Sequence, residues 1–357
     1  MISNSSYDAV SRQWRSKIDE SQDFRVVRND SVFRAGFFRP SVFESEYRKA
    51  RDLKTFFMRT HAGMAVEEVF NGRSIYTPEG ECFEISTPTD IRVPSPDPER
   101  IKNRILEDLT LVRGIGPVTA AELRRKGHRT VEDLVIHRRF HDGAKECINR
   151  VLDGKPGEIV SFIEHRHSPS HPLAILASGL FEHDTYLFLD LETMGFFSRP
   201  VILFGIASIE DERVVVRQFL VRGMEEELPA LYQTLRHLQE KPVVVSYNGK
   251  TFDIPYLISR SAFYGDMMDK PCHHIDLLHA SRRSAGHQLQ DCRLSTIEQH
   301  LLGTSRPHDL PGSMVPEFYE TYLQSGNPGP LVPIVEHNLE DVASLAKLLS
   351  LFFEGPT

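Results

Sequence analysis

The stretch Tyr186-Leu-Phe-Leu-Asp-Leu-Glu-Thr-Met-Gly195 has the pattern of a buried strand that ends in a glycine turn. Its first four residues are apolar on both faces, which is typical of a central strand in a covered sheet. Asp190 and Glu192 lie two positions apart, so both carboxylates point to one face of such a strand. Folding does not require these two like charges, which repel each other unless a cation lies between them. A single D-x-E pair is weak evidence for a metal site, so the site depends on acids elsewhere in the chain.

The composition is that of a soluble protein with more than one folded unit. At 357 residues, with 40% hydrophobic and 26% charged residues, the chain is long enough for two or three units. It has no apolar stretch long enough to span a bilayer and no secretory signal at its N-terminus. Four scattered cysteines without a C-x-x-C pair argue against a zinc knuckle and against a disulfide framework. We therefore expect a cytoplasmic protein with reduced thiols and no membrane association.

The net charge of -8 is distributed unevenly along the chain. Residues 100–150 hold twelve Lys and Arg against seven Asp and Glu, a local +5, which leaves -13 for the remainder. A basic segment inside an acidic protein is typical of nucleic-acid contact. A solvated helical face explains the same charges equally well.

The N-terminal part of the chain contains one predicted hairpin and one proline-rich stretch. Residues 1–59 show no clear period, and no role is assigned to them. The run Arg73–Ile85 predicts a β-hairpin around Pro-Glu-Gly-Glu. Thr87–Pro98 has four prolines in twelve residues, so we interpret it as a linker that forms neither a helix nor a central strand.

A helical segment with two closely spaced glycines follows this linker. Gly114 and Gly116 flank the apolar Ile115. Pro117 takes the first position of a predicted helix, and Gly127 ends it. The segment therefore predicts a tight turn that leads directly into a helix N-terminus.

A second helix is predicted to begin at Thr130, which would cap it, with Asp133 three residues further on. From Leu111 to Leu134 the segment resembles the helix-hairpin-helix module. This resemblance implies contact between backbone N–H groups of the turn and a nucleic-acid phosphate, without reading of bases. A plain helical connector with a glycine turn is the alternative. The residues expected at the phosphate are Gly114, Ile115 and Gly116, with Arg113, Arg124, Arg125 and Lys126 as supporting charges.

From about Leu173 onward the chain alternates between strands and helices. The first strand is followed by strand patterns at 201–209 and 214–220, and the short connections predict an antiparallel meander. Helical spacing at 225–238 leads to a further strand at 242–246. Three antiparallel strands, a helix and a parallel strand are the order of the ribonuclease H-like fold. This is an α/β fold, a mixed sheet flanked by helices, with active-site acids at strand ends and on the helices.

Two later segments add acids in the same part of the chain. Ser246–Leu257 predicts a strand end, a turn at Asn248 and a helix with Asp253 near its start. In the last helical segment His337 and Asp341 are four residues apart and share one face. Taken singly, Asp253 is explained as a first-turn acid, Asn248 as a turn former, and the last pair as surface residues. Their order along the chain favours a common site.

These segments together resemble the three exonuclease motifs of the DEDD superfamily, and the proofreading domains of family B DNA polymerases carry similar forms. The similarity is closer to the YprB-like family of ribonuclease H-like proteins, over roughly residues 174–353. It rests on Val245–Asp253, His274–Leu278, Arg282-Arg283, Cys292–Glu298, Asp309–Gly312, Pro316–Tyr319 and Glu336–Asn338 with Asp341.

The resemblance implies a metal-dependent 3′–5′ exonuclease that hydrolyses phosphodiesters of single-stranded DNA by a two-metal mechanism. It implies that Asp190, Glu192, Asp253 and Asp341 hold two Mg²⁺ or Mn²⁺ ions about 3.5–4 Å apart. Hard oxygen ligands without cysteine also favour Mg²⁺ or Mn²⁺ over zinc. His337 is the expected general base.

His337 departs from the superfamily pattern, in which a His stands five residues before the last Asp or a Tyr stands four before it. An imidazole at the tyrosine spacing leaves metal ligation and phosphate binding as alternatives to the role of base. Asn248 and Phe252 match positions at which related nucleases contact the terminal nucleotide. The remaining candidates are Lys250, Arg260, Arg282 and Arg283, as backbone contacts or surface charges, and Asp276, as support for the site or a helix cap.

We therefore predict an N-terminal segment at 1–98, a helical helix-hairpin-helix module at 99–167 and a ribonuclease H-like exonuclease domain at 168–357. The partner is nucleic acid, DNA rather than RNA, and no basic tail or coiled coil indicates a protein partner. One alternative is an RNA-directed or internally cutting nuclease of the same fold. The other is a non-catalytic nucleic-acid-binding adaptor in repair, against which the presence of all four acids argues.

Overall fold

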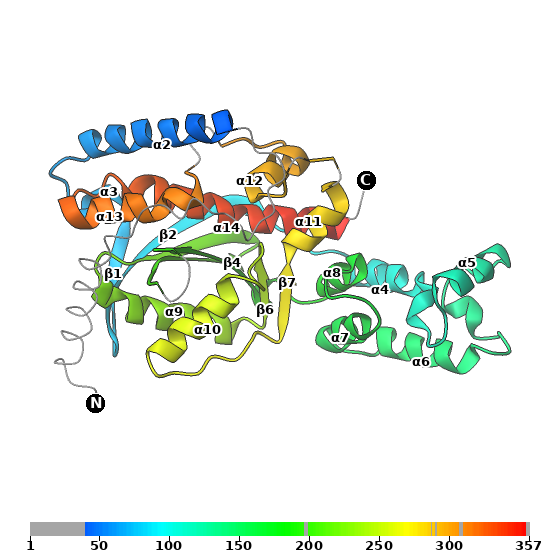
Figure 1. Ribbon diagram of the computed structural model, residues 1–357. Helices are drawn as coiled ribbons and strands as arrows, with labels where there is room; N and C mark the ends of the chain where they lie inside the picture. Colours follow the sequence, from blue (N-terminus) through cyan, green and yellow to red (C-terminus); the bar gives the residue numbers. More distant parts are fainter. Residues whose placement is uncertain (1–39, 196–198, 287, 290, 307–309, 355–357) are drawn as a thin grey trace.

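A single mixed sheet lies at the centre of the computed structural model, which describes residues 40–195, 199–286, 288–289, 291–306 and 310–354 (Figure 1). Its seven strands have the order β1-β2-β5-β4-β3-β6-β7. The pairs β3–β6 and β6–β7 are parallel, and the other pairs are antiparallel. The predicted meander with a following parallel strand is confirmed. The strands are β1 (Gly72–Thr77), β2 (Gly80–Arg92), β3 (Tyr186–Thr193), β4 (Val201–Glu210), β5 (Arg213–Leu220), β6 (Val243–Ser246) and β7 (His273–Asp276).

Helices cover both faces of this sheet. In Figure 1, α14 and α13 lie along one face, with α2 above them, and α9 and α10 lie on the other. Their bounds are α2 (Pro40–Thr60), α3 (Val66–Val69), α9 (Glu227–Glu240), α10 (Asp253–Phe263), α11 (Leu277–Ala285), α12 (Leu294–Ile297), α13 (Val315–Ser325) and α14 (Leu331–Glu354).

Strand β3 contributes to the cores on both faces because its residues alternate between them. Tyr186 and Phe188 pack in one cluster with side chains of α14. Leu187 and Leu189 pack in another with side chains of α9 and α10. Even-numbered positions of β3 therefore face α14, and this alternation places Asp190 on that side.

A helical module projects to one side of the sheet, beside β7 (Figure 1). It has a hydrophobic core of its own. As predicted, Pro117 is the first residue of α5, and Gly116 occupies the cap position. The helices are α4 (Pro98–Leu106), α5 (Pro117–Arg125), α6 (His141–Leu152), α7 (Pro156–Arg166) and α8 (Pro172–Ser178).

The helix predicted to begin at Thr130 is replaced by a single 3-10 turn, η2 (Glu132–Leu134), so that prediction is wrong. The Asp133 carboxylate accepts the backbone N–H groups of Arg129 at 2.6 Å and Thr130 at 2.9 Å. These bonds satisfy two backbone N–H groups that precede the turn, as an acid at the third position of a helix does for its cap residue. The acid therefore closes a turn where a helix start was expected.

The first half of the proline-rich stretch, residues 87–92, is a strand, which corrects the interpretation of the whole of 87–98 as a linker. β2 continues through Pro88 to Arg92 and pairs there with β5 alone, because its pairing with β1 ends at Ile85. A strand with one unpaired edge tolerates proline, and the register shifts between Pro88 and Arg92. The predicted hairpin is present, and its strands belong to the same sheet as β3.

No helix within the described ranges is both long and apolar enough to cross a membrane. Residues 1–39 of the predicted N-terminal segment, and Asp309 of the motif Asp309–Gly312, lie outside the residues that the structure describes.

Candidate active site

The site begins with the two acids near the end of β3. Asp190 and Glu192 lie at the carboxyl end of a strand that is hydrogen-bonded on both sides, to β4 and β6. Both are largely withdrawn from solvent, and Glu192 is 7% exposed. The tertiary structure therefore holds two carboxylates in a region where charge is poorly hydrated.

The third acid, Asp253, is the first residue of α10 and is 3% exposed. Its Oδ1 accepts the backbone N–H of Leu191 at 3.1 Å, which ties the start of α10 to β3 between the first two acids. The preceding turn is held by Asp276, which accepts the N–H groups of Asn248 at 2.8 Å and Lys250 at 3.1 Å. Asp276 is therefore an anchor for the turn that delivers Asp253.

Two backbone features make this turn specific. Asn248 has a φ of 66°, in the left-handed region that asparagine tolerates better than most residues. At Gly249 a Cβ would overlap the Ser246 hydroxyl and would lie 2.9 Å from Asp253 Oδ2. Only glycine fits between the end of β6 and the acid. Asp276 also caps α11 by accepting the N–H of Leu278 at 3.1 Å.

The last helix supplies the fourth acid and a histidine. His337 Nε2 lies 3.5 Å from Asp341 Oδ2, one turn further along α14, and 3.9 Å from Glu192 Oε1 on β3. The imidazole is 15% exposed and stands between two acids that come from different elements. The predicted shared face of α14 thus points at the strand acids.

The pKa shifts indicate that the four acids share one electrostatic environment. Burial raises the pKa of Asp190 well above its ordinary value, and the charges of Asp341, Glu192 and Asp253 raise it further. Burial also raises the pKa of Asp253 to about 7, and Asp341 contributes to this shift. Like charges that raise one another's pKa in a buried site are stabilised by a bound cation. The structure therefore brings together the four predicted acids and His337.

An amide network behind Asp190 was not foreseen from the sequence. Asn338, which is wholly buried, donates from Nδ2 to Asp190 Oδ2 at 2.8 Å and to the Asp190 carbonyl at 3.2 Å. Gln218 donates to Asn338 Oδ1 at 2.9 Å and to the Val335 carbonyl at 2.9 Å. A Cβ at Gly205 would overlap the Asn338 amide, so this glycine lets α14 approach the sheet.

The signals for this network are present in the sequence but are weak. Asn338 belongs to the stretch Glu336–Asn338 that carried the family resemblance, although no role was assigned to it. Gly205 interrupts an apolar strand pattern, which is typical of close backbone approach. Gln218 in a strand has no distinguishing pattern, and only the fold reveals its position.

Arg306 is a second residue that sequence reasoning missed. Its side chain is 6% exposed and forms an ion pair with Asp341. It also donates from Nε to Glu298 Oε2 at 2.7 Å, and Glu298 is 2% exposed. Arg306 therefore holds Asp341 by one oxygen, Oδ1, and leaves Oδ2 on the side of His337.

The two residues predicted to touch a nucleotide flank the Asp253 turn. Asn248 is half-buried within the turn. Phe252 directly precedes Asp253, and its ring lies 5.3 Å from that of Tyr256, partly packed on the core. Both positions adjoin the acids, and their contact with substrate stays a prediction.

Two of the four basic candidates, Arg260 and Arg283, have structural partners. Arg260 is wholly buried and donates from Nε to Glu227 Oε1 at 2.7 Å, so neither of its predicted roles, as a backbone contact or a surface charge, is correct. Arg283 donates to the Ser170 carbonyl at 2.5 Å and thereby joins α11 to the helical module. The buried pair shows that the helix face bearing Arg260 is directed into the core.

The predicted phosphate contacts lie in the helical module, away from the acids. In Figure 1, α5 stands at the end of the module that is distant from the sheet. Gly114 has a φ of 87°, and Ile115 is 5% exposed. Arg113 and Lys126 are exposed near the two ends of this turn and helix.

Comparison with known proteins identifies the domain that carries the acids. Residues 187–352 match the family model described as RNase_H superfamily. The uncharacterized protein YprB of Bacillus subtilis (strain 168) is 34% identical over 184 residues, which are 50% of this chain and 44% of that protein. This part of the chain is therefore similar to the RNase H superfamily, and the predicted resemblance to the YprB-like family is confirmed.

The chain covers less than half the length of this relative. The family B DNA polymerase from the hyperthermophilic archaeon Pyrobaculum calidifontis is a similar solved structure. The match covers 46% of this chain and 24% of the polymerase, with 20% identity and a TM-score of 0.36.

Proposed function

We propose that the protein is a metal-dependent nuclease that removes nucleotides from the 3′ end of single-stranded DNA. The observation that carries this proposal is the buried group of four carboxylates, supplied by β3, α10 and α14, whose charges raise the pKa of Asp190. Similarity to the RNase H superfamily supports a phosphodiester as the substrate. The polarity and the sugar preference rest on the resemblance to DEDD exonucleases.

The donor set fits divalent ions of the magnesium class. Asp190, Glu192, Asp253 and Asp341 offer only carboxylate oxygens, and their mutual repulsion is relieved by positive charge. When bound, two Mg²⁺ or Mn²⁺ ions would supply an activated water and stabilise charge on the reacting phosphate.

Residues around the acids would position these ligands and handle a proton. Asn338 holds one oxygen of Asp190 by an amide N–H, which favours the ionised carboxylate without adding a competing cation. His337, between Glu192 and Asp341, is placed to accept a proton from water at Nε2. Arg306 restrains Asp341 from the opposite side.

The helical module would hold the strand by its phosphates. The turn Gly114–Gly116, in which the two glycines are exposed and Ile115 is buried, leads into the N-terminus of α5, and free backbone N–H groups at a helix N-terminus bind anions. Arg113 and Lys126 add positive charge near this turn. Such contacts are independent of base sequence, so the module would act on any single strand.

The test is hydrolysis of 5′-labelled single-stranded DNA and RNA of equal sequence with Mg²⁺, Mn²⁺ or EDTA. Asp190→Asn keeps the shape of the side chain and removes its charge, and the matched control Glu240→Gln changes an exposed acid of α9 that pairs only with Arg236 on the surface. We expect a ladder that shortens from the 3′ end, is abolished by EDTA and by Asp190→Asn, and is unchanged in the control.

A circular single-stranded DNA separates exonuclease from internal cutting, because it has no end to degrade. Cleavage of the circle would contradict the exonuclease proposal, and faster hydrolysis of RNA would contradict the preference for DNA. If the parent chain binds the strand but hydrolyses neither substrate with any metal, the catalytic proposal is wrong and a binding role replaces it.

A further inference from the structure

A second cluster of metal-ligating side chains lies in the helical module, outside the acid site. Among the described residues, Asp108, His167 and His171 form a group in which one ligand atom from each lies within 4.8 Å of the others. The four acids do not form such a group in the same ranges. All three side chains are partly buried.

The geometry of the cluster is set by three helix ends. Asp108 caps the 3-10 turn η1 (Leu109–Leu111), His167 follows the last residue of α7, and His171 caps α8. His167 Nε2 lies 3.1 Å from Asp108 Oδ2. The two imidazoles are stacked, with ring centroids 4.0 Å apart and an interplanar angle of 11°. Three segments of the module therefore converge on one point.

The surroundings fix the carboxylate and leave one of its oxygens available. Asp108 Oδ1 accepts the N–H of Thr110 at 2.9 Å and its hydroxyl at 2.7 Å, and Oδ2 faces the histidines. His171 Nδ1 accepts the N–H of Leu173 at 3.3 Å, a long bond that a metal can replace. Burial and the neighbouring His167 lower the pKa of His171 from its ordinary value, while the charge of Asp108 acts in the opposite direction.

An ion pair between Asp108 and His167 explains only part of this arrangement. Protonation of His167 would satisfy Asp108, but it gives no reason for the second imidazole, which stacks on the first and accepts the N–H of Leu173 at Nδ1. Two imidazoles beside one carboxylate are a common set of ligands for a transition metal.

We propose that Asp108, His167 and His171 bind one divalent transition-metal ion of the zinc class. Imidazole nitrogens favour Zn²⁺ or Co²⁺ over Mg²⁺, which distinguishes this site from the all-carboxylate site on the sheet. Small rotations of the side chains would bring the ligand atoms to the bonding distance of about 2.0–2.2 Å.

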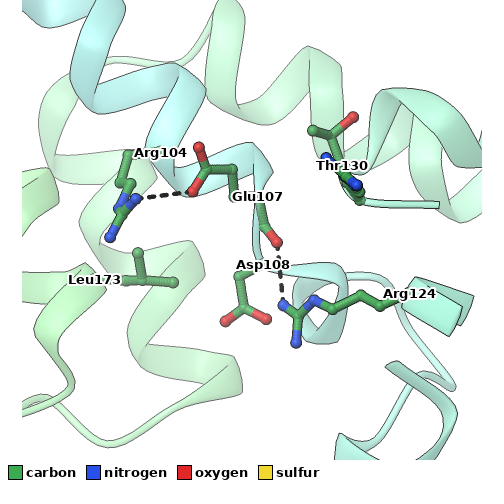
Figure 2. A pocket seen from close by; sticks show the side chains of 7 residues that line it. Arg104, Glu107, Asp108, Arg124, Thr130 and Leu173 are labelled. Atoms are coloured by element: carbon green, nitrogen blue, oxygen red, sulfur yellow. Dashed lines mark hydrogen bonds and ion pairs between the residues drawn. The ribbon is translucent and has the colours of Figure 1, made fainter. Parts of the chain in front are cut away.

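The cluster lies beside a cavity, at a point where several segments of the helical module meet. Asp108 also lines a cavity of about 620 Å³, shown in Figure 2 with Arg104, Glu107, Arg124, Thr130 and Leu173 around it; Arg129 completes its lining. Ser170, between the two histidines, accepts a hydrogen bond from Arg283 of α11. A bound ion would therefore hold together η1, α7 and α8 at the junction with the ribonuclease H-like domain.

The test uses the full chain carrying Asp190→Asn. Excess Mg²⁺ is present so that Co²⁺ bound at the acid site does not contribute to the signal. Co²⁺ is titrated into the chelator-treated protein and followed by its visible absorption, and Zn²⁺ is then added as a competitor. We expect one Co²⁺ per chain, displaced by Zn²⁺. In His167→Gln the affinity for Co²⁺ should fall by about 10- to 100-fold or more.

His165→Gln is the matched control, because His165 lies near the same helix end, is exposed and has a contact of 2.6 Å with the Ser161 carbonyl in its own turn. It should bind Co²⁺ like the parent. His171→Gln provides an independent test if His167→Gln does not fold, as judged by circular dichroism without metal. Equal Co²⁺ affinity in the cluster variants and in His165→Gln, or absence of Co²⁺ bands in the parent, would overturn the proposal.

Discussion

The Nδ2 atom of Asn338 on α14 donates a hydrogen bond of 2.8 Å to Oδ2 of Asp190 on β3. This bond fixes one oxygen of an acid whose pKa is raised by burial and by the other three carboxylates, and it directs the orientation of that acid. The residue that follows the expected base in the sequence therefore also holds an acid of the site. An amide suits this position because it stabilises the ionised acid while carrying no charge of its own.

We expect Asn338→Ala to lower Mg²⁺-dependent hydrolysis by about 10- to 100-fold and to raise the Mg²⁺ concentration required, because Asp190 loses its positioning partner. Asn338→Asp should be worse, since a second carboxylate would face Asp190 and raise its pKa further. The measurement is the initial rate as a function of Mg²⁺ concentration. If Asn338 has only a structural role, Asn338→Ala should be less stable. The initial rate of its folded fraction should then depend on the Mg²⁺ concentration as the rate of the parent does.

Gly205→Ala should reproduce the effect of Asn338→Ala without removing any polar atom of the site. The added Cβ would overlap the Asn338 amide, so α14 must shift away from the sheet or the amide must rotate. Gly312→Ala is the matched control, because a Cβ there meets no atom within 4 Å. If Gly205→Ala retains full activity and normal Mg²⁺ dependence, the close approach of α14 at this glycine does not position Asp190.

The general architecture was predictable because it depends on patterns that survive in a single sequence. The apolar run before Asp190 and the short connections after it predict a central strand and an antiparallel meander, and both are present. The spacing of His337 and Asp341 predicts a shared helix face for the same reason. The periodicity of a strand or helix determines which face a side chain occupies, and the orientation of the acids follows from this periodicity.

The partners of the acids were not predictable because they come from segments without a distinctive pattern. Arg260 lies on a helix near the acids and resembles a substrate-binding arginine, but Glu227 of α9 neutralises it in the core. Pro88 suggested a linker because its place at an unpaired strand edge depends on where β1 ends. Such outcomes depend on tertiary packing, which propensity and spacing do not encode.

His274 on β7 should make the fold sensitive to mild acid. Burial lowers its pKa to about 4, and its Nε2 lies 2.8 Å from the Ser246 hydroxyl. Because the pKa in the unfolded chain is about 6.5, the unfolded state binds more protons between these values, so stability falls as the pH decreases through this range. The shift corresponds to about 3 kcal/mol of unfolding free energy at full effect.

Urea unfolding at pH 7, 5.5 and 4 tests this dependence, with His274→Gln as the variant and the exposed His165→Gln as the control. The difference in stability between the parent and His274→Gln should shrink or reverse as the pH falls, because glutamine does not take up a proton. An identical pH dependence in the parent and in His274→Gln would show that other groups cause the acid sensitivity.

Arg306→Ala should destabilise the metal-free protein by about 3–5 kcal/mol, because it leaves Glu298 and Asp341 without their buried cationic partner. Bound Mg²⁺ should recover part of the lost stability, because the cation also compensates the charge of Asp341. It should not recover the part that comes from Glu298, which has lost its ion pair with Arg306. Urea unfolding with and without Mg²⁺ measures both effects. Arg236→Ala, which breaks an exposed pair with Glu240, should change stability by less than about 1 kcal/mol in either condition. If Mg²⁺ stabilises the parent and Arg306→Ala equally, Asp341 and Arg306 do not share the charge balance of the acid site.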